Sequence, residues 1–184
     1  MTAAELFNLK GRVALVTGAS SGLGVRFAEV LAREGAPVAL VARRTDRLAA
    51  VKARIEHAGG RAIAIAADVL DRKAMTRAFD EAEKAFGAVT ILVNNAGVAH
   101  AGRAVELSEA EWRRVVGTDL DAVFFWAQEG ARRMLAAKKT STCATESRSP
   151  MRPVLVAPFC RLRRFATKAP RSREFWSAPT PRST

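Results

Sequence analysis

Hydrophobic and polar positions alternate along the first three quarters of the chain in two recurring patterns. Short runs of consecutive apolar residues predict strands buried on both faces, at Arg12–Val16, Val38–Val41, Ala62–Ala66 and Thr90–Val93. Between them, apolar residues at helical spacing predict helices from the glycine cluster to about Glu34, over Asp46–His57 and over Asp71–Phe86. This alternation indicates an α/β fold whose parallel sheet is covered on both faces and joined by right-handed crossovers.

A longer helical pattern follows the fourth predicted strand and runs from about Glu109 to Ala137. Ser108 stands directly before it, and Glu111 follows Ser108 at the spacing of a capping box. The sequence therefore predicts a long helix with a defined start at residue 109.

The character of the chain changes at about Lys138–Thr140. All 12 glycines precede this point, whereas six of the seven prolines and both cysteines follow it. Frequent proline and the loss of helical periodicity predict a poorly ordered tail. We therefore expect one domain over residues 1–139 and a basic Pro/Arg/Ser-rich tail over residues 140–184.

The net charge of +12 is divided unevenly between these segments. Residues 1–139 hold 21 of the 30 basic and 16 of the 18 acidic groups, a net of +5, which leaves +7 for the tail. The tail's basic and aromatic runs, 161–168 and 171–176, contain the ingredients of a phosphate-backbone or acidic-lipid surface. Since no recognised nucleic-acid module surrounds them, nucleic-acid binding stays an alternative that we do not expect.

Other features of the composition narrow the class of protein. No apolar stretch approaches the length of a membrane span, and the first ten residues do not resemble a secretory signal, so we expect a soluble, cytoplasmic protein. Cys143 and Cys160 are isolated, and we interpret them as plain thiols. We expect neither a metal site nor a disulfide framework.

The strongest chemical signal is the run Thr17–Gly24, TGASSGLG, between the first predicted strand and the first helix. Glycines permit the tight turn, let the backbone approach a pyrophosphate, and leave that group at a helix N-terminus with unpaired N–H donors. The alternative is an ordinary glycine-rich turn. The candidate cofactor-binding residues here are Thr17, Gly18, Ser20, Ser21, Gly22, Leu23 and Gly24.

This glycine pattern resembles that of the short-chain dehydrogenase/reductase family. Further matches are Asn94–Gly97 (NNAG), which borders the cofactor in the family, Asp68–Val69, which resembles the pair beside the adenine ring, and the lead-in Leu9–Val16. The resemblance covers about residues 7–139 and adds Asp68, Val69, Asn95, Ala96 and Gly97 to the candidate cofactor-binding residues.

The resemblance implies a Rossmann-type doubly wound parallel sheet in the strand order 3-2-1-4, truncated, with the long helix and a largely irregular C-terminal tail. It also implies an NAD(P)-dependent oxidoreductase that transfers hydride between the cofactor and a small-molecule carbonyl or alcohol. In relatives the long helix packs against a second copy. A homo-oligomer through residues 109–137 would use the apolar side chains of Val115, Val116, Val123, Phe124 and Trp126. The alternative is that these side chains cover the chain's own sheet.

The second predicted strand ends in Ala42-Arg43-Arg44, where an acidic residue would bind the ribose hydroxyls of NAD. An arginine there is able to neutralise a 2′-phosphate with its fork of donors. We therefore predict NADP in preference to NAD and favour Arg43, with Arg44 beside it. The alternative is that these arginines only solvate the start of the next helix.

The catalytic residues of the family are missing. The family protonates the substrate oxygen with a tyrosine, assisted by a lysine four residues later and a serine upstream, but this chain contains no tyrosine. Asp119 occupies the place of a family asparagine in the long helix, and its carboxylate cannot donate as an amide does. His100, on the loop after Gly97, has no evident orienting partner and is not expected to replace the acid.

The tail departs from the family, which continues into a fifth strand and the Tyr/Lys helix. Its composition resembles a GC-rich coding region read out of frame, so our leading hypothesis is a frameshift or a truncated gene. Within it, Val154–Ala157 after Pro153 is suited to add to the open sheet edge. We predict NADP binding with weak or absent activity; the alternatives are a non-catalytic nucleotide-binding or interaction protein and a basic-tail nucleic-acid binder.

Overall fold

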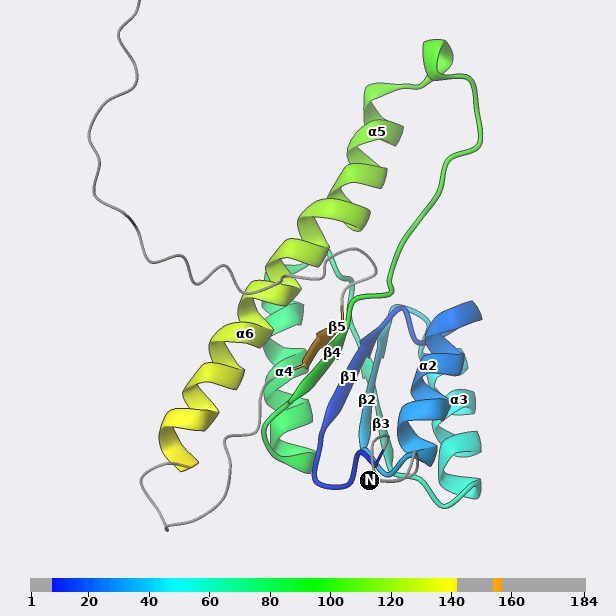
Figure 1. The fold of residues 1–184 in the computed structure, drawn as a ribbon. Coiled ribbons are helices and arrows are strands. Elements are labelled where there is room, and N and C mark those ends of the chain that lie inside the picture. Colours follow the sequence, from blue (N-terminus) through cyan, green and yellow to red (C-terminus); the bar gives the residue numbers. More distant parts are fainter. Residues whose placement is uncertain (1–7, 142–153, 157–184) are drawn as a thin grey trace, which may run out of the picture.

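The computed structural model describes residues 8–141 and 154–156. Strands and helices alternate along the chain as the hydrophobic pattern predicts (Figure 1). Their bounds are β1 Ala14–Thr17, α2 Gly22–Arg33, β2 Val38–Ala42, α3 Thr45–His57, β3 Ala62–Ala66, α4 Arg72–Phe86, β4 Ile91–Val93, a 3-10 turn Ala104–Glu106, α5 Glu109–Val116, a π-helical turn Gly117–Asp121, α6 Ala122–Ser141 and β5 Val154–Val156. Cys143, Cys160 and the basic runs 161–168 and 171–176 lie outside the described residues.

The five strands of the described residues form one parallel sheet in the order β3-β2-β1-β4-β5. The order 3-2-1-4 is therefore confirmed. The sheet also contains β5, whose Val154, Leu155 and Val156 pair with Ile91, Leu92 and Val93 of β4. The run after Pro153 thus adds to the sheet beside β4, as its apolar sequence suggested, although it belongs to the segment expected to be mostly irregular.

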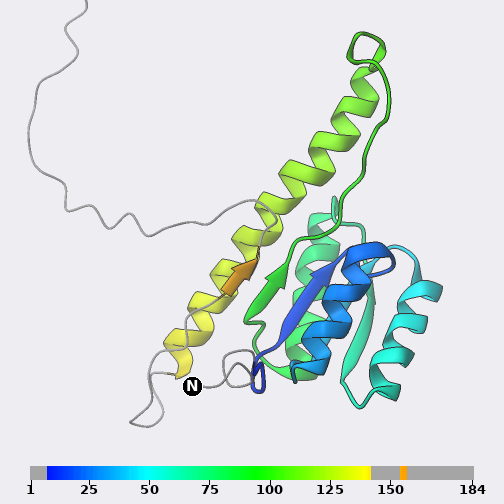
Figure 2. The same ribbon diagram turned by 45° about the vertical axis from the view of Figure 1, so that its right-hand side comes forward.

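Helices cover both faces of the sheet, which explains why β1 and β2 are apolar throughout (Figure 2). On one face, α2 and α3 pack through Ala28, Leu48 and Ile55 against alternate residues such as Val16 and Leu40. The other face buries a second cluster, which includes Leu15, Val41, Phe79, Leu92 and Trp126, under α4 and α6. The carboxyl ends of the strands stay accessible between these helix layers.

The long helix is confirmed in place, but it is not one regular α-helix. Ser108 caps α5 by accepting the N–H of Glu111 at 3.3 Å, which confirms the predicted start of the helix. The Ser108 hydroxyl also donates to the Glu111 carboxylate at 3.0 Å, whereas in a capping box that carboxylate would accept the Ser108 backbone N–H. Between α5 and α6 lies the π-helical turn Gly117–Asp121. Among the helices of the described residues, none is long and apolar enough to cross a membrane.

Trp126 corrects one expectation about the surface of this helix. Its side chain is 1% exposed and packs against Phe79 of α4, with ring centroids 5.6 Å apart. It therefore covers the chain's own sheet rather than offering apolar surface to a second copy. Phe124 does lie exposed, as do the large apolar side chains of Trp112, Leu120 and Leu135.

An ionic cluster joins α6 to α4. Arg133, whose side chain is 19% exposed, contacts Asp80 at 2.7 Å, Glu83 at 2.8 Å and Glu129 at 2.7 Å. Burial lowers the pKa of the Arg133 guanidinium, but the hydrogen bonds to Glu129, Asp80 and Glu83 outweigh it and hold the pKa above its usual range. The guanidinium therefore stays charged and connects the two helices that cover this face.

We expect Arg133→Met to lower the free energy of unfolding by about 2 kcal/mol, less than for a fully buried pair because Asp80 is exposed. The methionine keeps apolar contact with Phe79 but leaves three carboxylates without their cation. Urea unfolding followed by circular dichroism measures the change. Arg132→Met, at an exposed position of the same helix, is the control; equal stability of the two variants would contradict the role given to Arg133.

Candidate functional site

The glycine loop between β1 and α2 lies directly against the chain that follows β4. Gly18 has a φ of +68°, and a Cβ there would come within 2.8 Å of the Ala96 Cα. A Cβ at Gly24 would collide with the Gly18 carbonyl and the Asn95 side-chain nitrogen. Glycine at both positions therefore allows the two backbones to meet, which the sequence pattern anticipated only as a close approach to a ligand.

Thr17 and Asn95 join the carboxyl ends of the two central strands. The Thr17 hydroxyl accepts the backbone N–H groups of Asn95 at 3.0 Å and Ala96 at 3.1 Å. The Asn95 side-chain nitrogen donates back to the Thr17 carbonyl at 3.1 Å. Because Thr17 is 2% exposed, its role is to hold the strands together, and it does not line the cavity described next.

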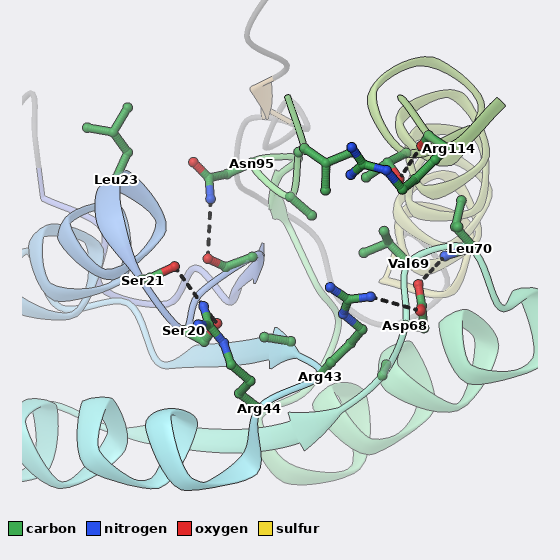
Figure 3. Close-up of a pocket in the computed structure, with 17 residues that line it drawn as sticks. Ser20, Ser21, Leu23, Arg43, Arg44, Asp68, Val69, Leu70, Asn95 and Arg114 are labelled. Atoms are coloured by element: carbon green, nitrogen blue, oxygen red, sulfur yellow. Dashed lines mark hydrogen bonds and ion pairs between the residues drawn. The ribbon is translucent and has the colours of Figure 1, made fainter. Parts of the chain in front are cut away.

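A cavity of about 460 Å³ opens at this edge of the sheet (Figure 3). All predicted cofactor residues except Thr17, Gly22 and Gly24 line it. The structure adds six lining residues that the sequence analysis did not select: Ala42, Ala67, Leu70, Val98, Arg114 and Thr118. Arg114 and Thr118 stand four positions apart and so share a helix face, the signal that might have found them.

Helix α2 begins at the cavity with its donors available. Its N-cap, Ser21, makes no side-chain hydrogen bond to the helix, and the first turn contains no acidic residue. The N-terminal N–H groups and the positive end of the helix dipole therefore face this region without a compensating carboxylate. This arrangement suits an anionic group such as a phosphate.

The two arginines after β2 make different contacts. One nitrogen of Arg44 donates to the hydroxyls of both Ser20, at 3.0 Å, and Ser21, at 2.9 Å, in the glycine loop. Arg43 instead faces Asp68 after β3, at 3.7 Å between charged atoms (Figure 3). Both lie at the cavity, which with Arg114 has three cationic side chains and one carboxylate, Asp68, in its lining.

The loop after Gly97 is tied to α5 and the π-helical turn. Val98 donates its N–H to Asp119 at 2.9 Å, and Arg114 donates to the Ala99 carbonyl at 3.3 Å. His100 pairs with Glu111 at 2.8 Å. Asp119 thus holds the loop by accepting a hydrogen bond, which an asparagine oxygen would do equally well. His100 has a carboxylate partner but does not line the cavity.

These features define a class of protein. A parallel sheet whose first strand leads through a glycine loop into an uncapped helix, with basic side chains beside it, is a Rossmann-type NAD(P)-binding fold. The family model for short chain dehydrogenase matches residues 12–158, a range that includes β5. The chain belongs to this family of NAD(P)-dependent oxidoreductases.

Individual relatives agree with this assignment. Gluconate 5-dehydrogenase of Gluconobacter oxydans (strain 621H) is 36% identical over 150 residues, 80% of this chain and 59% of that protein. The NADP-dependent (R)-specific alcohol dehydrogenase of Lentilactobacillus kefiri is 39% identical over 127 residues, 68% of this chain and 50% of its own. The crystal structure of a metagenomic short-chain oxidoreductase in complex with NADP superposes with a TM-score of 0.67 at 38% identity, covering 71% of this chain and 60% of that one. The chain thus spans between 50% and 60% of the length of these proteins.

We expect Gly24→Ala to destabilise the chain by about 3 kcal/mol, because the new methyl group meets backbone and Asn95 at a packed contact. Gly22→Ala is the matched control, since a Cβ at Gly22 meets nothing within 4 Å and only its φ of +58° is unfavourable. The control should lose about 1 kcal/mol. Thermal unfolding of both variants decides: a control that is as unstable as Gly24→Ala would refute the close approach as the cause.

Proposed function

We propose that this chain binds NADP in the cavity at the carboxyl ends of the strands. The observation that carries the proposal is the contact of Arg44 with Ser20 and Ser21 at the start of the uncapped helix α2. This contact gathers a guanidinium, two hydroxyls and free backbone donors around one point. Such a set matches the multiple acceptor oxygens of a phosphate. In this proposal the 2′-phosphate lies beside Arg44 and the two hydroxyls, and the pyrophosphate lies at the N-terminus of α2.

The remaining candidate residues take the other parts of the cofactor. Asp68 and Val69 border the adenine, and Asn95, Ala96 and Gly97 border the nicotinamide half. Arg43 and Arg44 bind the 2′-phosphate. Because the pairing with Asp68 competes for Arg43, we assign the larger share of that binding to Arg44. The complex of the metagenomic relative with NADP supports this choice of cofactor.

We further propose that the chain as written does not reduce carbonyl compounds. NADPH, when bound, would supply a hydride, but the substrate oxygen must then receive a proton from the protein. The family uses a tyrosine for that proton, and the sequence has none. Asp119 already accepts a hydrogen bond from Val98, and His100, although it has a carboxylate partner in Glu111, does not line the cavity, so we assign neither as a replacement acid.

The proposal also includes a substrate class and an oligomeric state. Relatives named for gluconate and for an (R)-specific alcohol point to small hydroxylated or carbonyl compounds as the substrate class of the family site. The exposed apolar side chains of the long helix support pairing with a second copy of the chain: these are Trp112, Leu120, Phe124 and Leu135.

Titration of the purified chain with NADPH, followed by the nucleotide's fluorescence, tests binding, and the same preparation incubated with a panel of ketones and aldehydes tests turnover. We expect saturable binding without NADPH oxidation above the protein-free rate. Sustained oxidation that depends on the ketone would contradict the second part of the proposal. Absence of any fluorescence change would contradict the first.

Arg44→Gln should raise the Kd for NADP about 10- to 100-fold, because charge-assisted hydrogen bonds to the 2′-phosphate are lost. The Kd for NAD, which lacks that phosphate, should change much less. Isothermal titration calorimetry with both nucleotides gives the ratio. Arg47→Gln, at an exposed position of α3 away from the cavity, serves as the control. Equal loss of NAD and NADP affinity in Arg44→Gln would assign Arg44 to the glycine loop's conformation instead.

A further inference from the structure

The indole of Trp126 makes a polar contact at the back of the proposed cofactor cavity. Its N–H donates to the carbonyl of Val69 at 3.0 Å, while its ring packs on Phe79. The indole is 1% exposed and Val69 is half-buried, so this hydrogen bond is partly shielded from water. A partly shielded carbonyl that loses its donor is destabilised, and the backbone around it is then driven to find another partner.

Val69 lies in the middle of the turn between β3 and α4, which forms one wall of the cavity. Its neighbours on both sides, Asp68 and Leu70, also line the cavity (Figure 3). The turn is ordered within itself, because the Asp68 carboxylate accepts the Leu70 N–H at 3.0 Å and the Asp68 carbonyl accepts the Asp71 N–H at 3.1 Å. The indole of Trp126 adds a contact of a different kind, from the turn to helix α6.

We propose that Trp126 is a positioning residue for the adenine end of the cofactor cavity. Its N–H fixes the orientation of the Val69 peptide, and this peptide sets where the Asp68–Leu70 wall stands relative to Gly97 and Val98 across the cavity. Trp126 itself touches no ligand. The inference rests on the proposed binding of a dinucleotide, with its adenine against Asp68 and Val69.

The position of the wall predicts a specific pattern of affinities. NAD and NADP share the adenosine that would contact the Asp68–Leu70 wall, so a displaced wall should raise the Kd for both nucleotides by the same factor. The larger share of the 2′-phosphate binding is assigned to Arg44, which contacts Ser20 and Ser21 of the glycine loop rather than the Asp68–Leu70 wall. Loss of the indole N–H should therefore leave the ratio of the two dissociation constants unchanged, whereas Arg44→Gln changes that ratio.

Trp126→Phe removes the N–H and keeps an aromatic ring against Phe79. We expect it to raise the Kd for both NADP and NAD about fivefold, the equivalent of one neutral hydrogen bond, with the ratio unchanged. Trp112→Phe, at a 56% exposed position of α5, is the matched control and should bind both nucleotides as the unaltered chain does. Benzothienylalanine at position 126 keeps the shape of the indole without its N–H. It should raise both Kd values by the same factor while the packing on Phe79 is retained, and it replaces Trp126→Phe as the test if that variant does not fold.

Phe79→Leu separates positioning from packing, since it loosens the ring contact and leaves the indole N–H in place. We expect it to lower the melting temperature with little change in either Kd. Unchanged affinities in the benzothienylalanine protein would overturn the proposal, as would a change in the NAD to NADP ratio. If the unaltered chain binds neither nucleotide, the proposed function fails and this inference with it, an outcome that the unaltered chain alone reveals.

Discussion

The joint between Thr17 and Asn95 is the contact on which the rest of the site depends. It locks the carboxyl ends of β1 and β4 together through hydrogen bonds in both directions. It can form only because Gly18 and Gly24 carry no side chains, so that the glycine loop lies on the backbone of the residues after β4. The helix that starts behind this loop then points its free N–H groups into the space above the joint.

The walls of the cavity come from five separate parts of the chain: the glycine loop, the residues after β2, β3 and β4, and the long helix. The long helix contributes Arg114 from α5 and Thr118 from the π-helical turn. These parts meet because parallel strands all end at the same edge of a sheet. The cavity is thus lined by residues other than those that carry the family's proton donor, and the proposal of binding without reduction rests on this separation.

The sequence predicted the sheet and the glycine loop well, because both are recorded in local patterns: consecutive apolar residues for strands buried on two faces, and glycines at a strand-to-helix turn. It favoured Arg43 over Arg44, but neighbouring residues of an extended chain point to opposite sides, and only the structure shows that Arg44 is the one that contacts Ser20. The sequence also left open whether Trp126 faces the sheet or a second copy of the chain, because the helix around it is apolar on more than one face. Arg114 went unnoticed for another reason: its partner, Ala99, belongs to a loop rather than to any motif.

The π-helical turn at Gly117–Asp121 sets the rotational phase of the long helix. A turn that closes from residue i to i+5 contains one residue more than an α-helical turn, and each residue rotates the helix by about 100°. Before the turn, Arg114 lines the cavity; after it, Trp126 and Met134 are buried in the cluster that covers the sheet. In a regular α-helix of the same sequence, Trp126 and Met134 would be rotated by about 100° relative to Arg114 from where they lie in this structure. The π-helical turn thus fixes the rotation about the helix axis between Arg114, which lines the cavity, and Trp126, which packs on the sheet.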